Sequence, residues 1–153
     1  MQVPEFLISR TERQLDMLFA AARKLPEDKL DWQPAPGARS ALSQLQEIAT
    51  SVDAFWEAHA KREIVWSEES MAKWQAERSK LTNLDELEAK TRESHARLFD
   101  FICTVTPQQL REEVKMPFPG QFDLAYILTY YFYNAAYHEG QINYIASILA
   151  PTS

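Results

Sequence analysis

Three polar side chains interrupt an otherwise apolar face near the end of the chain, and their types make them the strongest candidates for chemistry. Asn134, His138 and Gln141 follow one another at steps of four and three, so they share one face of a helix. Apolar side chains continue that face on both sides, namely Ile127, Tyr131 and Ile145. Buried amides and imidazoles must be hydrogen-bonded or bind a ligand, so this spacing predicts a polar site inside the protein.

The element that carries these residues is expected to be one long helix over residues 123–149. This stretch contains no proline and is apolar on nearly every side, which is typical of a helix covered by its neighbours. At about 1.5 Å per residue, the helix would be roughly 40 Å long. Asp123 is expected to cap its first turn.

Three further helices are predicted from apolar side chains at helical spacing. They are a first helix from about Pro4 to Pro26, a second from a cap at Ser40 to Arg62 or Glu63, and a third from a cap at Asn83 to about Thr104. Together the four amphipathic helices predict an all-α four-helix bundle that forms a single domain over residues 1–153. Sites in such bundles are built from side chains on facing helices.

The connection between the second and third predicted helices is long. It is expected to hold a short helix begun by Ser67 or Ser70, and it could serve as a lid or carry an interface. Trp66 and Trp74 in this connection are either an exposed anchor pair for a second subunit or the walls of a pocket, and the sequence is consistent with both interpretations.

Composition and charge narrow the classes of partner and compartment. The chain carries a formal net charge of −6, so binding to a phosphate backbone would oppose the overall field, and nucleic acid is not an expected partner. Cys103 is the single cysteine, which favours a reducing, cytoplasmic compartment, and its apolar neighbours predict a buried thiol. Neither a membrane-spanning helix nor a signal peptide is expected from the hydrophobic pattern.

Three stretches of the chain resemble the DinB/YfiT-like superfamily of four-helix bundles: LDWQPAPGARS, SALSQLQEIA and NAAYHEGQINYI. Members of that family typically carry one histidine early in the second helix and an H-x3-H pair in the fourth, and these three histidines bind a divalent metal. The corresponding positions here are Glu47, Asn134 and His138, so one histidine of the three is kept. The resemblance therefore implies a family fold with a degenerate metal triad.

One hypothesis keeps the metal. A carboxylate at Glu47 is an acceptable ligand for zinc or nickel, whereas a neutral amide oxygen at Asn134 is a weak donor. What is known of the family would then imply a metal-dependent thiol-transferase or hydrolase-like activity, in which a small-molecule thiol or a water occupies the open coordination positions. Many relatives are homodimers, which implies a homodimer here.

The second hypothesis is free of metal. Glu47 could accept a hydrogen bond from His138, with Asn134 bridging the two, and the protein would then be a non-catalytic binding or structural homodimer with a vestigial site. Helical periodicity alone predicts that Glu47 lies on a solvated face, whereas the family resemblance implies that it points into the bundle. The residues are consistent with either an enzyme or a non-catalytic protein.

Several other residues are weighed as neighbours of this site. Gln141, Tyr131 and Tyr137 are candidates to line the pocket, and His95 could approach it from the third helix, although locally satisfied histidines are commoner. His59 is expected to be solvated. The tyrosines of the last helix are expected to pack in the core or at an interface.

Overall fold

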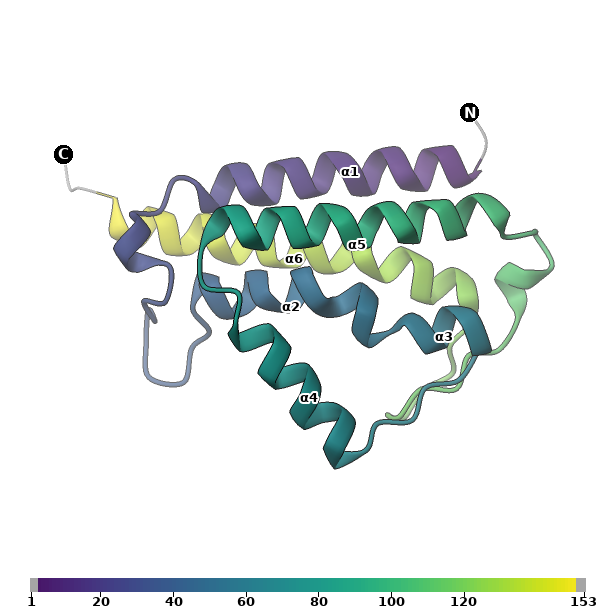
Figure 1. Ribbon diagram of the computed structural model, residues 1–153. Helices are drawn as coiled ribbons and strands as arrows, with labels where there is room; N and C mark the ends of the chain where they lie inside the picture. The colour runs from purple at the N-terminus through teal and green to yellow at the C-terminus, as the bar shows by residue number, and fades with distance from the viewer. Residues whose placement is uncertain (1–2, 151–153) are drawn as a thin grey trace.

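Four long α-helices lie side by side along most of the molecule (Figure 1). The computed structural model describes residues 3–150. The long helices are α1 (Val3–Ala22), α2 (Ala41–Ala54), α5 (Leu84–Thr104) and α6 (Leu124–Leu149). Shorter elements lie between them, namely the 3-10 helices η1 (Glu27–Lys29) and η2 (Gln109–Arg111) and the α-helices α3 (Trp56–Lys61) and α4 (Glu68–Ser79). The predicted all-α four-helix bundle is thus confirmed.

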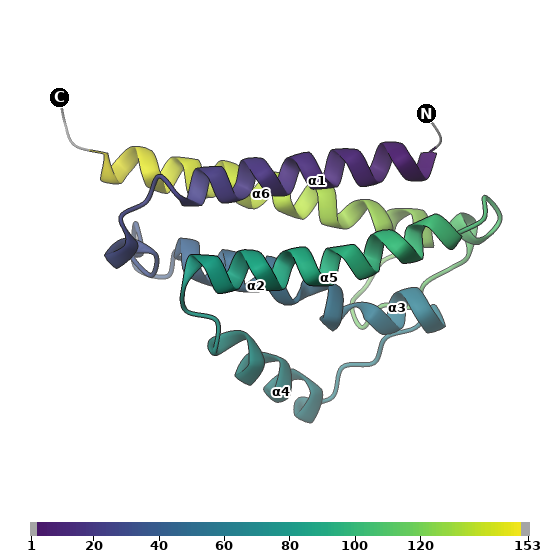
Figure 2. The ribbon, with the colours of Figure 1, turned by 45° about the horizontal axis from the view of Figure 1, so that its top comes forward.

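The helices pair in parallel, which explains the long connection expected after the second helix. In Figure 1, α1 and α6 run in one direction and α2 and α5 run in the opposite direction. The main helix contacts are α1 with α6 and α2 with α5, and Figure 2 shows these pairs as two layers. A short turn cannot join parallel neighbours, because the chain must first return to the end from which it started. The segment from the end of α3 through α4 makes this return (Figure 1).

Caps begin the helices where the sequence predicts them. The Ser40 hydroxyl accepts a hydrogen bond from the Ser43 N–H at 3.2 Å at the start of α2. The Asn83 side chain accepts from Glu86 at α5, and the Asp123 carboxylate accepts from the Tyr126 N–H at 2.8 Å at α6. Such caps satisfy N–H groups that lack partners in the first turn, so they define where each helix starts.

The prediction that the second helix runs unbroken to Arg62 or Glu63 is wrong. The helix α2 ends at Ala54, and α3 begins after Phe55, whose backbone lies at φ −101° and ψ 8°. No proline or glycine marks the break. The Phe55 ring instead packs against Trp66 and Tyr130, each at a centroid distance of 5.6 Å. We attribute the break to this aromatic packing.

The prediction of a buried thiol is also wrong, because Cys103 is exposed. It lies on the outer side of α5, while the neighbouring Ile102 fills the core. Among the residues that the structure describes, no helix combines the length and apolar character needed to cross a membrane.

Candidate functional site

Glu47 on α2 and His138 on α6 face each other across the bundle. Oε1 of Glu47 lies 3.3 Å from Nε2 of His138. His138 is 1% exposed, whereas the Glu47 side chain is 22% exposed. The carboxylate therefore stands between a buried imidazole and the surface.

The other ring nitrogen of His138 is held by two amides. Its Nδ1 lies 2.8 Å from Oε1 of Gln44 and 3.2 Å from Oε1 of Gln141. The Gln44 amide nitrogen donates to the Arg39 carbonyl, which keeps the amide oxygen turned toward the histidine. Amide and carboxylate oxygens are acceptors, so both ring nitrogens face acceptors and an imidazolium would satisfy both.

Asn134 and Arg39 complete the hydrogen bonding of Glu47. The Asn134 amide nitrogen donates to Oε1 of Glu47 at 3.3 Å, and the Arg39 guanidinium donates to Oε2 at 2.7 Å. We use the name polar cluster for these six residues: Arg39, Gln44, Glu47, Asn134, His138 and Gln141. The structure therefore brings together Glu47, Asn134, His138 and Gln141, four of the predicted site residues.

The charges around Glu47 hold it ionised. Burial alone would raise the pKa of its carboxyl group, but the hydrogen bond and charge of His138, together with Arg39, outweigh burial and lower the pKa to about 2. The carboxylate thus remains a counter-ion over the physiological range.

A shallow groove of about 490 Å³ opens beside the polar cluster. Arg39, Gln44 and Gln141 line it with polar groups, and Tyr137 and Tyr144 line it with aromatic rings. The Tyr137 ring also packs edge-on against His138 at a centroid distance of 5.3 Å. A ligand in the groove would therefore contact the partners of His138 instead of the imidazole itself.

The polar cluster fits a transition metal poorly. Glu47 Oε1 and His138 Nε2 are 3.3 Å apart, a separation that two ligands of one tetrahedral ion can have when each bond is about 2.0–2.2 Å. However, Asn134 presents an N–H donor to the same oxygen, and Arg39 places a positive charge on the other. Within residues 3–150, no group of three or more His, Cys, Asp or Glu side chains gathers in a geometry that could hold an ion.

His95 and Tyr131 lie elsewhere in the bundle. The Tyr131 hydroxyl is 3.1 Å from Nε2 of His59, and the rings of His59 and His95 pack against the Tyr131 ring at 5.6 and 5.7 Å. His59 is 0% exposed, so the expectation that it is solvated is wrong. These three residues form a second buried centre, which we call the histidine pair with Tyr131.

Sequence reasoning missed two members of the polar cluster, Gln44 and Arg39. Gln44 lies three residues before Glu47 on α2, a spacing that places both on one helical face. Arg39 precedes the capping Ser40, where a loop arginine gives no periodic signal. Gln44 could have been found from its helical spacing to Glu47, once Glu47 was assigned to the interior of the bundle.

The tyrosines of α6 divide between core and surface. Tyr131 is 2% exposed, whereas four others are exposed, namely Tyr126, Tyr133, Tyr137 and Tyr144. This division follows the helical period, because the exposed tyrosines share the side of α6 that faces away from the bundle.

Comparison with known proteins places these observations in a family. A family model described as the DinB superfamily matches residues 10–142. Among solved structures, the chain is similar to YfiT from Bacillus subtilis, described as a probable metal-dependent hydrolase with an unusual four-helix bundle topology. The two share 17% sequence identity, and the match covers 97% of this chain and 90% of that chain with a TM-score of 0.78.

Two further solved structures are similar over nearly their whole length. A DinB-like protein from Bacillus subtilis is 15% identical, with 96% of this chain and 94% of that chain covered and a TM-score of 0.67. The colibactin self-resistance protein ClbS, solved in complex with a dsDNA, is 13% identical, with 96% and 97% covered and a TM-score of 0.70. No curated protein matches the chain. At these identities, the structural likeness shows the fold.

Proposed function

The chain belongs to the DinB superfamily, and we propose that it binds a small molecule beside a metal-free polar cluster, without catalysing a reaction there. One observation carries the proposal. The Glu47 carboxylate, at a position where the family resemblance expects a histidine ligand, is held at once by His138, Asn134 and Arg39. A carboxylate with three donors is already satisfied without an ion.

The same contacts argue against acid–base catalysis by His138. A general base needs a nitrogen within hydrogen-bond reach of the substrate proton. Both ring nitrogens of His138 already contact protein oxygens, and the side chain is 1% exposed. A fully satisfied buried network instead makes the bundle rigid.

The groove beside the polar cluster supports the binding role. Its volume of about 490 Å³ lies within the range of small-molecule sites. Tyr137 and Tyr144 offer ring faces, while Arg39 and Gln141 offer hydrogen-bond donors. This lining suits a small aromatic molecule that carries a hydrogen-bond acceptor.

Metal analysis tests the first half of this proposal. Protein purified without a histidine tag and then incubated with Zn²⁺ or Ni²⁺ should retain neither ion at stoichiometric level after dialysis. A His59→Phe variant controls for the loss of a histidine outside the polar cluster. One equivalent of metal that is lost in His138→Ala but kept in His59→Phe would overturn the proposal. It would favour the metal-dependent thiol-transferase or hydrolase-like alternative.

Fragment binding followed by NMR tests the second half. Aromatic fragments with an acceptor group should shift backbone resonances near Tyr137 and Gln141, and the shifts should weaken in Tyr144→Ala. Tyr126→Ala is the matched control, because Tyr126 is exposed on the same helix but does not line the groove. Fragments that bind equally well to wild type and Tyr144→Ala would contradict a role for the groove.

An aromatic stripe on α6 supports the proposed homodimer. Tyr126, Tyr133, Tyr137, Tyr144 and Ile148 are all exposed, and their steps of seven and four align them along one side of the helix. Exposed apolar stripes of this kind often mark interfaces. A second copy packed on this stripe would also close one side of the groove.

Light scattering after size exclusion tests the homodimer. Wild type should elute as a dimer, and Tyr133→Lys should elute as a monomer, because a charge at the centre of an apolar interface is costly. Val65→Lys places the same charge at another exposed apolar site, on the connection before α4, and should remain dimeric. A monomeric wild type would contradict this part of the proposal.

The absence of nucleic-acid binding stays a prediction. It depends on the net charge of −6, which opposes binding to phosphates. The complex with dsDNA belongs to ClbS, and a gel-shift titration at low salt would test the point for this chain. A cytoplasmic location likewise stays a prediction.

A further inference from the structure

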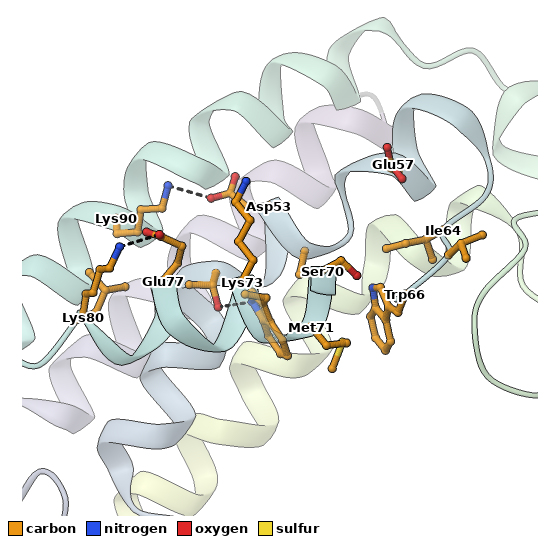
Figure 3. Close-up of a pocket in the computed structure, with 15 residues that line it drawn as sticks. Asp53, Glu57, Ile64, Trp66, Ser70, Met71, Lys73, Glu77, Lys80 and Lys90 are labelled. Atoms are coloured by element: carbon orange, nitrogen blue, oxygen red, sulfur yellow. Dashed lines mark hydrogen bonds and ion pairs between the residues drawn. The ribbon is translucent and has the colours of Figure 1, made fainter. Parts of the chain in front are cut away.

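A second and larger cavity, of about 710 Å³, lies under α4 (Figure 3). Its walls come from α2, α3, residues 64–66, α4 with the two residues 80–81 that follow it, and α5. None of the six residues of the polar cluster lines it, so the two cavities are separate. We call it the α4 pocket. Its volume is within the range of sites for small organic molecules.

Two tryptophans form rigid walls of the α4 pocket. The Trp74 indole N–H donates to Thr50 Oγ1 on α2 at 2.9 Å, and the Arg78 guanidinium lies 5.3 Å from the centre of the Trp74 ring. The Trp66 ring packs against Phe55 at 5.6 Å and Phe118 at 6.1 Å. These contacts hold the apolar rings in place, which reduces the entropy cost of binding a ligand between them. Of the two interpretations of this tryptophan pair, the structure therefore favours pocket walls.

The three carboxylates that line the α4 pocket are already paired with cations. Asp53 pairs with Lys90 at 2.8 Å and with Arg97, Glu77 pairs with Lys80 at 2.7 Å, and Glu57 pairs with Lys61 at 2.7 Å. The negative charges of the rim are therefore neutralised from within the protein.

Lys73 is the lining charge that remains without an ion pair among residues 3–150. Glu77 lies one helical turn further along α4, but its carboxylate pairs with Lys80. Figure 3 shows the Lys73 side chain extending from α4 along the pocket toward Asp53, while the Asp53 carboxylate is joined to Lys90. The pocket thus has an apolar interior and one ammonium group that interacts with Glu77 only through its charge and forms no ion pair among residues 3–150, on a protein of net charge −6.

We propose that the α4 pocket binds a small aromatic carboxylic acid, with the ring packed between Trp66 and Trp74 and the carboxylate paired with Lys73. An ammonium–carboxylate contact beside apolar walls is stronger than one in open solvent, because the walls exclude part of the water. A lysine that forms no ion pair with the protein also selects acids over neutral analogues of the same shape. This site is independent of the function proposed for the groove.

The helix α4 is suited to adjust around such a ligand. It has no buried residue, and its ties to α2 include the Trp74 and Arg78 hydrogen bonds to Thr50 and the Ser43 carbonyl. An element with few buried apolar contacts opens at low free-energy cost. A bound aromatic acid would add apolar contact to α4 and hold it more firmly against α2.

A pair of matched probes tests the proposal. Binding of 2-naphthylacetate and of its neutral amide is measured by isothermal titration calorimetry at low salt, with tryptophan fluorescence as a second readout. In wild type, the acid should bind about tenfold tighter than the amide or more, as expected for a charge-assisted hydrogen bond. Lys73→Gln should abolish this preference, whereas Lys29→Gln, which removes an exposed charge that does not line the pocket, should keep it.

Trp66→Ala locates the binding site, because it should weaken both probes without changing their ratio. Several results would overturn the proposal: equal affinity of acid and amide in wild type, a preference that survives in Lys73→Gln, or no binding of either probe. Failure of the proposed groove function would appear instead in Tyr144→Ala, which leaves the α4 pocket intact. The two proposals can therefore fail separately.

Discussion

Two regions of the bundle each bury histidine against α6, and they treat it in opposite ways. In the polar cluster, both nitrogens of His138 face oxygen acceptors, and the ionised Glu47 is within 3.3 Å. In the histidine pair with Tyr131, His59 and His95 lie among aromatic rings, and neither forms a hydrogen bond or ion pair with a carboxylate of residues 3–150. All three histidines are at most 2% exposed, so burial alone does not distinguish them.

The two regions differ in the partners of their histidines and not in the degree of burial: amide and carboxylate oxygens contact His138, whereas aromatic rings surround His59 and His95. Burial, together with the smaller effect of the nearby charges of Arg62 and Arg97, lowers the pKa of His59 to about 4. Burial likewise lowers the pKa of His95 to about 4, although a hydrogen bond to the Thr91 carbonyl acts in the opposite direction. In the polar cluster, the shifted group is the carboxylate: the hydrogen bonds and charges of His138 and Arg39 lower the pKa of Glu47 to about 2 in spite of its burial.

The histidine pair also contains an unsatisfied atom. Among the described residues, Nδ1 of His59 is a buried side-chain nitrogen without a hydrogen-bond partner. Such an atom is costly, and the aromatic contacts of His59 with Trp56, Phe101 and Tyr131 must offset the cost. In the polar cluster, by contrast, both ring nitrogens of His138 have hydrogen-bond partners.

Acidification should have the largest effect, and it should act through the histidine pair. Because the folded-state pKa of His59 and of His95 is lowered, the unfolded chain binds more protons below its ordinary pKa of about 6.5. The free energy of unfolding should therefore fall as pH drops from 6.5 to 4, by on the order of 3 kcal/mol for each histidine. Chemical denaturation at several pH values in this range measures the slope.

A His59→Phe variant sharpens this test. It should be less stable at pH 7, because the Tyr131 hydroxyl loses its partner, yet its stability should fall less between pH 6.5 and 4. Glu47→Gln should keep the wild-type slope between pH 6.5 and about 5, because the contribution of Glu47 changes with pH only below about 4.5. Equal slopes in wild type and His59→Phe would show that the two regions do not differ in the way described.

Neutralising Glu47 should have the next largest effect. Glu47→Gln preserves the shape of the side chain but removes the counter-ion of His138 and Arg39, and it should cost about 1–3 kcal/mol at pH 7. The folded-state pKa of Glu47 is lowered, so this contribution is complete above pH 4.5 and is lost as pH falls toward 2. Wild type and variant should thus converge in strong acid. If the urea midpoint of Glu47→Gln at pH 7 equals that of wild type, Glu47 makes no stabilising contact inside the bundle, and this prediction is wrong.

Most of the fold could be predicted from local signals. Ser40, Asn83 and Asp123 cap the helices as predicted, because a cap needs one side chain and a backbone N–H three residues away. The break at Phe55 could not be predicted, since it depends on rings that come later in the chain. The wrong prediction for His59 has another cause. His59 follows Phe55 by four residues and so continues the apolar face of Leu45, Ile48 and Val52, a spacing that the prediction of a solvated side chain did not use.

The candidate site was predictable in part. Spacing alone identified His138 and Asn134 as inward-facing polar residues, and both are buried. Glu47 lies at the edge of the apolar face of α2, so periodicity suggested solvent and the family resemblance suggested the interior. The Glu47 side chain is 22% exposed, which agrees in part with the expectation from periodicity and in part with the expectation from the family resemblance. Arg39 lies in a loop, and no pattern in the sequence relates a loop residue to a helix face.

The smallest effect should come from Arg39, the exposed member of the polar cluster. Its side chain is 42% exposed, so its ion pair with Glu47 is screened by solvent, and Arg39→Gln should cost less than about 1 kcal/mol. The loss should shrink further in high salt, unlike the loss in Glu47→Gln, because the contact between Glu47 and the buried His138 is less accessible to salt ions. Urea denaturation of both variants at low and high salt measures the difference. A different result would be an Arg39→Gln variant that loses as much stability as Glu47→Gln. The main partner of the Glu47 carboxylate would then be Arg39 and not His138. The contrast between the polar cluster and the histidine pair would in that case depend on an exposed charge and not on a buried contact.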